Sequence, residues 1–350
     1  MKYIKGFDTL RAVSVILVLV THLGAFHYLP ENNFVRLRVW SLLSGTTGVM
    51  VFFTLSGFLI TRILLIELQR FQNLDFWKFY ARRFLRLLPP LLVFYTAVLV
   101  LMKTGSITNS NAGFLFSFFY LYNFVPKQHY TGELGHTWSL ALEEQYYLLW
   151  PFAIQFVKGQ KKLIVLLLLF LLLSVTAVYA FPHWEFTHNF KSMRWFIPAA
   201  APIIIGSLFA ILVHNKKRED LVMMRNRNWL LAGAVILFLA PLYSPDLRLN
   251  FIPQSTGVAL LFVWILYNQE STLVKILDNK PLSYIGKISY GLYVYQGLFL
   301  KTGPGPDPSQ NIWIQSWPQN IILTFVVAIL SYHLLEQPVL KLKKRFTRIA

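Results

Sequence analysis

Cysteine is absent from this chain of 350 residues, and acidic side chains are scarce, with 15 Asp and Glu against 33 Lys and Arg. Without cysteine the chain forms no disulfide and has no thiol nucleophile. Charged residues make up only 14% of the sequence, whereas soluble domains average about 25%. The scarcity of charge excludes an ordinary soluble globular protein.

Hydrophobic residues take the place of the missing charge. They make up 55% of the chain, and the mean hydropathy is +0.50. Runs such as residues 163–181 are long enough to cross a bilayer. We therefore predict an all-α polytopic membrane protein with about ten transmembrane helices. The expected spans lie near 8–27, 46–66, 87–103, 138–157, 162–180, 196–213, 229–243, 251–268, 282–300 and 320–339.

A shorter apolar stretch, residues 112–125, decides the topology. If it crossed the membrane, the basic segment 158–162 and the basic tail could not share a side with the N-terminus and the loop 67–86. As a re-entrant or interfacial segment, it leaves every basic loop, including 214–228, on one side, as the positive-inside rule requires. We predict that the chain forms one domain over residues 1–350, spans the cell membrane many times and keeps both termini in the cytosol.

The formal net charge of +18 raises the question of a nucleic-acid partner. The charges lie in short loops between hydrophobic spans, where positive-inside topology already accounts for them. We therefore predict membrane lipids, and no nucleic acid, as the surroundings of these basic residues.

Two ionisable side chains interrupt the first expected span. Arg11 and His22 are eleven residues apart, which is about 16 Å along a helix. An ionisable group at bilayer depth costs at least about 2.5 kcal/mol on insertion scales, so two on one span indicate a function. The alternative for His22 alone, a hydrogen bond to a neighbouring helix, stays open.

A basic group precedes the third expected span. Arg83 and Arg86 are three residues apart and share one face of a helix, and Arg82 lies beside them. Arg11 is expected at the same depth in the membrane. The forked guanidinium donors match phosphate oxygens, so this group would suit the head of a polyanionic cofactor. A positive-inside anchor is the alternative, most of all for Arg82.

Two carboxylates stand at the start of the fourth expected span. Glu143 lies about 7 Å below the outer end by helical rise, where it could meet His22. We predict that His22 is a general base or an acyl carrier, and that Glu143 orients its ring and stabilises the imidazolium. Glu144 is better explained by a structural salt bridge or a position facing water.

These motifs together resemble the acyltransferase-3 family of integral membrane O-acyltransferases. The resemblance covers nearly the whole chain, because five motifs occur in the family's order. They are Arg11 and His22 with ten residues between them, the Ser-Gly-Phe segment in 48–62, Arg83 with Arg86, the Trp-Ser-Leu block ending at Glu143, and the closing segments 286–296 and 334–345. One departure is Arg-Ala-Val-Ser after the first arginine, where many members have Arg-Gly-Leu-Ala.

The resemblance implies transfer of an acyl group, most simply acetyl, from cytosolic acyl-CoA to a hydroxyl of a surface polysaccharide or a lipid-linked saccharide. It implies His22 and Glu143 as catalytic residues, Arg11, Arg83 and Arg86 as ligands of the CoA phosphates with Arg82 beside them, and no metal. The sequence contains no extracytoplasmic hydrolase-like domain after the last span. We therefore expect direct acylation of the acceptor or a separate extracytoplasmic partner, and the sequence leaves a homo-oligomer open.

A transporter or flippase of lipid-linked saccharides is the competing hypothesis. It would also need many spans and buried charges. Its usual mark is internal pseudo-symmetry with broken helices in matching halves, and the sequence shows no such repeat.

Overall fold

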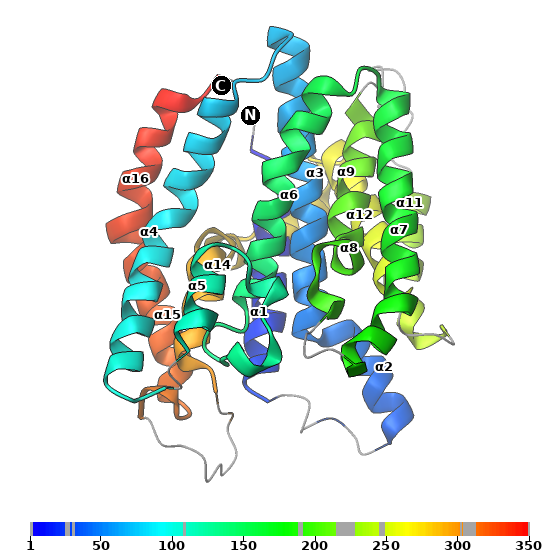
Figure 1. Cartoon of the computed structure of the whole chain (residues 1–350). Helices are drawn as coiled ribbons and strands as arrows, with labels where there is room; N and C mark the ends of the chain where they lie inside the picture. Colours follow the sequence, from blue (N-terminus) through cyan, green and yellow to red (C-terminus); the bar gives the residue numbers. More distant parts are fainter. Residues whose placement is uncertain are drawn as a thin grey trace.

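The computed structural model describes residues 3–24, 29, 32–107, 110–187, 192–214, 228–244, 249–301, 303 and 313–348, and all regular structure in these ranges is helical. The described chain begins and ends at the same end of a helical bundle, with α2 at the opposite end (Figure 1). We call the end with both termini the inner end, predicted to be cytosolic, and the opposite end the outer end. The helices longer than one turn are α1 Phe7–His22, α2 Asn33–Leu43, α3 Gly45–Phe71, α4 Phe76–Lys103, α5 Asn111–Phe118, α6 Thr137–Phe156, α7 Gln160–Thr187, α8 Phe196–Ala199, α9 Ala201–His214, α11 Asn228–Phe238, α12 Phe251–Tyr267, α13 Thr272–Leu277, α14 Lys280–Phe299, α15 Gln319–Ser331 and α16 Gln337–Leu342.

A helix lies at each of the expected spans, which confirms the all-α architecture. Within the described ranges, 4 helices are long and apolar enough to cross a membrane by length and composition. They are Phe34–Phe71, Phe76–Lys103, Gln160–Ala180 and Gln319–Leu342. The total of about ten crossings stays a prediction. Of the basic loop 214–228, residues 215–227 lie outside the described ranges.

Helix α1 ends five residues earlier than the expected span, and His22 is its last residue. Gly24 takes a left-handed conformation with a φ of 76°, and its N–H donates to the Thr21 carbonyl at 3.0 Å. A glycine in this conformation commonly ends a helix, because it has no Cβ to clash with the turned backbone. His22 therefore lies at the outer end of α1, where the expected span would have continued for five more residues.

Helices α3 and α9 touch through backbone at two glycines. A Cβ on Gly57 would lie 2.0 Å from the Ile203 carbonyl oxygen, and a Cβ on Gly206 would lie 2.0 Å from the Thr54 carbonyl oxygen. Small residues permit this close approach of helices in membranes. The contact fixes the rotation of α3, and so the direction of Ser56, which precedes Gly57.

The first half of the segment 112–125 belongs to α5, which has only eight residues, Asn111–Phe118. Eight residues extend about 12 Å, far short of the roughly 30 Å of a hydrocarbon core. A Cβ on Gly113 would lie 2.2 Å from the His129 carbonyl oxygen, so the chain folds back on itself here. The short helix agrees with the expected re-entrant or interfacial segment.

The last long helix contains a π-helical turn, Tyr332–Glu336, between α15 and α16. Glu336 is buried, and its carboxylate accepts from the Ser331 hydroxyl at 3.4 Å. The absence of a side chain on Gly291 leaves space for this carboxylate, because a Cβ there would lie 3.3 Å from Glu336 Oε1. Single π-turns inside α-helices are frequent near functional sites.

Candidate active site

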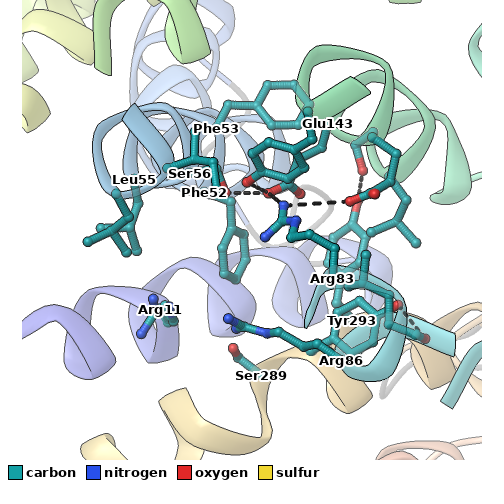
Figure 2. A pocket seen from close by; sticks show the side chains of 18 of the residues that line it. Arg11, Phe52, Phe53, Leu55, Ser56, Arg83, Arg86, Glu143, Ser289 and Tyr293 are labelled. Atoms are coloured by element: carbon teal, nitrogen blue, oxygen red, sulfur yellow. Dashed lines mark hydrogen bonds and ion pairs between the residues drawn. The ribbon is translucent and has the colours of Figure 1, made fainter. Parts of the chain in front are cut away.

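A cavity of ≈ 300 Å³ lies between α1, α3, α4, α6 and α14. Figure 2 shows its polar side chains converging from these helices. The polar residues around it are Tyr3, Asp8, Arg11, Ser56, Arg83, Arg86, Tyr120, Ser139, Glu143, Glu144, Tyr147, Ser289, Tyr290 and Tyr293. The structure thus brings together four of the predicted site residues, Arg11, Arg83, Arg86 and Glu143, from three separate helices.

Arginines gather at the inner end of the cavity. Arg11 pairs with Asp8 one helical turn earlier, with 2.6 Å between Nη1 and Oδ1. The guanidinium of Arg86 extends toward Arg11 above Ser289 (Figure 2). Arg86 lines the cavity, yet it has no hydrogen bond or ion pair with any described residue. A partly buried cation without a counter-ion is costly, so an anionic ligand would stabilise it.

Two carboxylates face Arg83 deeper in the cavity. Arg83 Nη2 lies 3.6 Å from Glu144 Oε1 and 4.0 Å from Glu143 Oε1, and its guanidinium stacks 3.3 Å from the centroid of the Tyr147 ring. Glu143 also accepts hydrogen bonds from the hydroxyls of Ser56 and Tyr147. These donors fix the orientation of Glu143, so Arg83 positions carboxylates instead of standing free for a phosphate.

Two hydroxyls close the outer end of the cavity. The Ser139 and Tyr293 hydroxyls are hydrogen-bonded to each other, and their oxygens lie 3.0 and 3.2 Å from the His136 carbonyl oxygen, which accepts from the hydroxyl whose hydrogen is left. The ring of Phe52 packs edge-on against Tyr293, with 6.1 Å between centroids. These side chains separate the carboxylates from the outer end of the bundle.

His22 does not line the cavity. Its Nδ1 lies 2.9 Å from the Val18 carbonyl oxygen, and a carbonyl only accepts, so Nδ1 carries the hydrogen. The lone pair of the neutral ring is then at Nε2, the atom suited to act as a base or nucleophile. His22 is exposed at the end of α1, and no contact joins it to Glu143 within the described part of the chain. The predicted dyad is therefore not formed in this structure.

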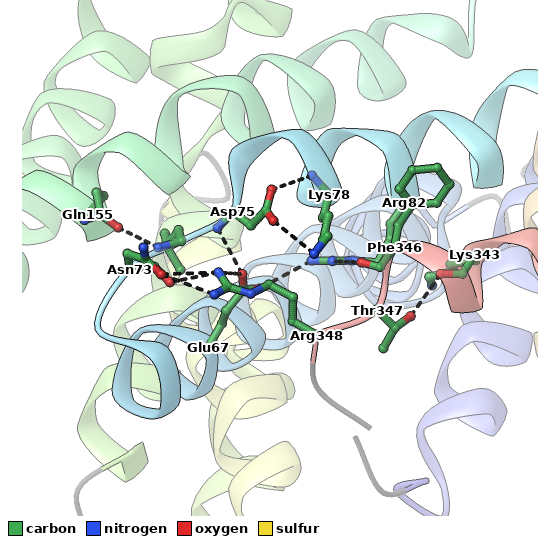
Figure 3. A network of polar contacts seen from close by, with 11 residues as sticks. Glu67, Asn73, Asp75, Lys78, Arg82, Gln155, Lys343, Phe346, Thr347 and Arg348 are labelled. Carbon is green, nitrogen blue, oxygen red and sulfur yellow. Dashed lines mark hydrogen bonds and ion pairs between the residues drawn. The ribbon is translucent and has the colours of Figure 1, made fainter.

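Arg82 also lies outside the cavity, in the polar network of Figure 3. Its Nη2 is 3.4 Å from Glu67 Oε2, and its Nη1 donates to the Phe346 carbonyl at 2.5 Å. Glu67 Oε1 accepts from Arg348 at 3.2 Å and from the Asp75 N–H at 3.0 Å. We call Glu67, Arg82, Asp75, Phe346 and Arg348 the Glu67 clasp. In this structure Arg82 joins the C-terminal tail to α3 and α4.

Asp75 begins α4 and belongs to the same network. Its carboxylate accepts the Lys78 N–H at 3.0 Å, and this hydrogen bond at the start of α4 lowers the pKa of the Asp75 carboxyl below its usual range. The capped start of α4 fixes where Arg82 and Arg83 point, since both follow within two turns.

Sequence reasoning did not predict Ser56, Tyr147 or Tyr293. Ser56 lies in the Ser-Gly-Phe segment, and Tyr147 is four residues after Glu143 on the same helix face, so both carried a local signal. Tyr293 meets Ser139 across 154 residues of sequence, which no local pattern indicates. Among the described residues, no three His, Asp or Glu side chains are grouped to hold a metal ion.

The cavity thus has arginines at its inner end and hydrogen-bonded carboxylates deeper inside. Residues 4–336 match the family described as acyltransferase domain, and the chain belongs to this acyltransferase-3 family. The expected family is therefore confirmed, and it does not favour the flippase hypothesis.

The chain is similar over 97% of its length to each of two relatives. It is 30% identical to the peptidoglycan O-acetyltransferase OatA of Listeria monocytogenes, of which it covers 56%, and 26% identical to the O-acetyltransferase OatA of Staphylococcus aureus strain NCTC 8325, of which it covers 58%. The chain thus spans a little more than half the length of these relatives. No solved structure matches it significantly.

Proposed function

We propose that this protein transfers an acetyl group from acetyl-CoA, or another acyl group from its acyl-CoA, to a hydroxyl of a cell-wall carbohydrate, with peptidoglycan or a lipid-linked saccharide as the acceptor. The family supports acyl transfer, and the names of the OatA relatives support O-acetylation of peptidoglycan. The chain acts as a single acyltransferase domain over residues 1–350, in the cell membrane, with both termini in the cytosol.

The single observation that carries the donor assignment is Arg86, which pairs with none of the described residues, beside Arg11 at the inner end of the cavity. Coenzyme A presents a diphosphate and a 3′-phosphate, and forked guanidinium donors match phosphate oxygens. Arg86 would bind a phosphate directly, and Arg11 would do so while keeping Asp8 as a neighbour. Arg83 serves the same site by holding Glu143 and Glu144.

The acyl group then has to pass from the cavity to the acceptor at the outer end. In the proposed step, the acceptor oxygen forms a bond to the acyl carbon as the carbon–sulfur bond of the thioester breaks. His22 Nε2 takes the hydroxyl proton, or first carries the acyl group itself, and the thiolate leaves with a proton as free CoA. Movement of Tyr293 and Phe52 would connect the cavity to His22.

Glu143 supports this step from inside the cavity. Its carboxylate faces Arg83 and accepts from two hydroxyl donors, so it is oriented in the resting protein. A dyad with His22 would form only in a state in which the outer end of the cavity is open. A second protomer or a separate extracytoplasmic partner could complete the acceptor site.

The test is acetyl transfer by the purified chain in lipid nanodiscs, with acetyl-CoA and peptidoglycan fragments. His22→Ala should insert normally and lose transfer by more than about 100-fold. His333→Ala, an exposed histidine on the π-turn, is the matched control and should remain active. Transfer by His22→Ala within about tenfold of the wild-type rate would rule out the role of His22.

A double variant then tests whether His22 and Glu143 act together. Adding Glu143→Gln to His22→Ala should cost little more than His22→Ala alone if the two residues form a unit during the reaction. Fully additive losses would show that they act in separate steps.

A further inference from the structure

The C-terminal tail lies at the inner end of the bundle, against α4, the helix that carries Arg82, Arg83 and Arg86 (Figure 1). After α16 it continues as a short 3₁₀-helix, Lys343–Phe346, which packs against α4. The Glu67 clasp holds this tail at two points, through the Phe346 carbonyl and through Arg348. Arg348 also lies 4.3 Å above the Phe71 ring. The tail is therefore fixed in place, with Glu67 fully buried beneath it (Figure 3).

Lys343 is the first residue of this fixed tail, and its surroundings are cationic. It is half-buried, and no carboxylate lies within ion-pair distance of its amine in the described part of the chain. The segment Lys343–Phe346 packs against α4, and the charges that act most strongly on the Lys343 amine are those of Arg86, Arg83 and Arg82 of α4 and Arg11 of α1. Burial and these four cations lower the pKa of the Lys343 amine to about 8. Such a gathering of like charges raises the free energy of the empty site.

The Glu67 clasp does not relieve this repulsion at Lys343. The Glu67 carboxylate already pairs with Arg82 and Arg348 and accepts from the Asp75 N–H, so it is not a counter-ion of Lys343. A tail needed only for anchoring would not have to place another cation beside Arg86.

We propose that Lys343 is a further phosphate ligand of the donor site, brought to Arg86 by the C-terminal tail and held there by the Glu67 clasp. This inference rests on the proposed function, because the anion it assigns is a phosphate of the acyl-CoA donor. The clasp residues are positioning residues in this arrangement, since they act through Lys343 and do not touch the donor. The tail would thus add a phosphate ligand at the inner end of the donor site.

The experiment measures CoA binding by calorimetry, with the full chain in nanodiscs of phosphatidylcholine. Lys343→Gln should weaken CoA binding about tenfold, the typical effect of one charge-assisted hydrogen bond. Arg345→Gln removes an exposed cation two residues further along the tail and should bind CoA as the wild type does. The same CoA affinity in Lys343→Gln and Arg345→Gln would overturn the inference while leaving the proposed donor intact.

The clasp is tested through Arg348→Ala. It should weaken CoA binding several-fold in the otherwise wild-type chain and have no further effect in Lys343→Gln, because it acts only through the position of Lys343. Losses that multiply in the double variant would overturn the role of the clasp. Failure of the wild-type chain to bind CoA would overturn the proposed donor and this inference together.

A lipid phosphate is the other source of the same chemistry. The binding measurements are therefore repeated in nanodiscs that contain phosphatidylglycerol. An effect of Lys343→Gln that appears only in these discs would assign the phosphate to a lipid headgroup and would overturn the donor assignment. An effect that is equal in both lipids supports it.

Discussion

Glu67 and Glu143 are two carboxylates beside arginines, and their surroundings differ. Glu67 is 1% exposed in its side chain, and both of its oxygens are occupied, by Arg82, Arg348 and the Asp75 N–H. The Glu143 side chain is 22% exposed, faces a cavity and shares Arg83 with Glu144.

The two regions differ equally in their arginines. In the Glu67 clasp, each arginine has a carboxylate and a backbone carbonyl as partners. In the cavity, the buried Nε of Arg83 has no hydrogen-bond partner in the structure, and Arg86 has none among the described residues. Among the described residues, the cavity arginines thus keep hydrogen-bonding capacity that a ligand could satisfy, whereas the arginines of the Glu67 clasp are paired within the fold.

The largest effect is expected at Glu143. Glu143→Gln keeps the size of the side chain and its hydrogen bonds to Ser56 and Tyr147 but removes the charge that faces Arg83. Turnover should fall about 100-fold, with CoA affinity and the thermal midpoint unchanged. Turnover assays and CoA titrations on the same preparation measure this. Glu144→Gln should be milder, and a larger loss there would assign the catalytic carboxylate to Glu144.

Removal of the charge of Glu67 should act on stability instead. Glu67→Gln leaves Arg82 and Arg348 without their shared carboxylate, and breaking a buried pair in this way costs about 3 kcal/mol. The thermal midpoint in nanodiscs should fall clearly. Glu270→Gln is the matched control, because its pair with Lys5 is exposed and worth less than about 1 kcal/mol. Equal midpoints in the two variants would contradict the structural role of the clasp.

Arg86 should show the opposite balance of effects. Arg86→Met removes a cation that faces Arg11 and Arg83, so the thermal midpoint should hold or rise. CoA affinity should fall about 30-fold, because a charge-assisted contact to phosphate is lost. Arg86→Lys should recover only part of this affinity, since an ammonium does not replace the guanidinium fork. A lowered midpoint with unchanged CoA affinity would make Arg86 structural.

The smallest effect concerns pH. Lys343 has a pKa of about 8 in the free protein, and only its charged form attracts phosphate, whereas the arginines that face it stay charged. CoA affinity should therefore decrease several-fold as the pH rises from about 7 to about 9, until the higher pKa of the bound state limits the loss. Calorimetric titrations across this range should give a flatter profile for Lys343→Gln. Parallel profiles would show that Lys343 is not the titrating group.

Much of the cavity could be predicted from the sequence, because its residues lie on regular helices. Helical rise placed Arg11 at the depth of Arg83 and Arg86, and the three-residue spacing put the latter two on one face. The hydrophobic runs of the sequence predicted where these helices lie. The structure accordingly brings all three arginines and Glu143 to one cavity.

The remaining features depend on contacts that periodicity does not encode. Arg82 has the same local sequence signal as Arg83, yet it joins the Glu67 clasp, because Arg348 and Phe346 return to it after more than 260 residues. The depth of His22 depends on the left-handed turn at Gly24, which ends α1 early. Pairing across the bundle and the choice of helix ends are decided by tertiary packing, so neither followed from the spacing of single residues.

The π-turn at Tyr332–Glu336 also determines how far the residues that follow it are rotated about the helix axis. A π-turn accommodates one residue more than an α-helical turn, and one residue corresponds to about 100° of rotation around a helix axis. Deletion of the exposed Leu335 would restore regular winding and turn α16 and the tail by that angle. Lys343 would then face away from α4, and Arg348 would no longer reach Glu67. The orientation of the whole tail thus depends on a single inserted residue in the preceding helix.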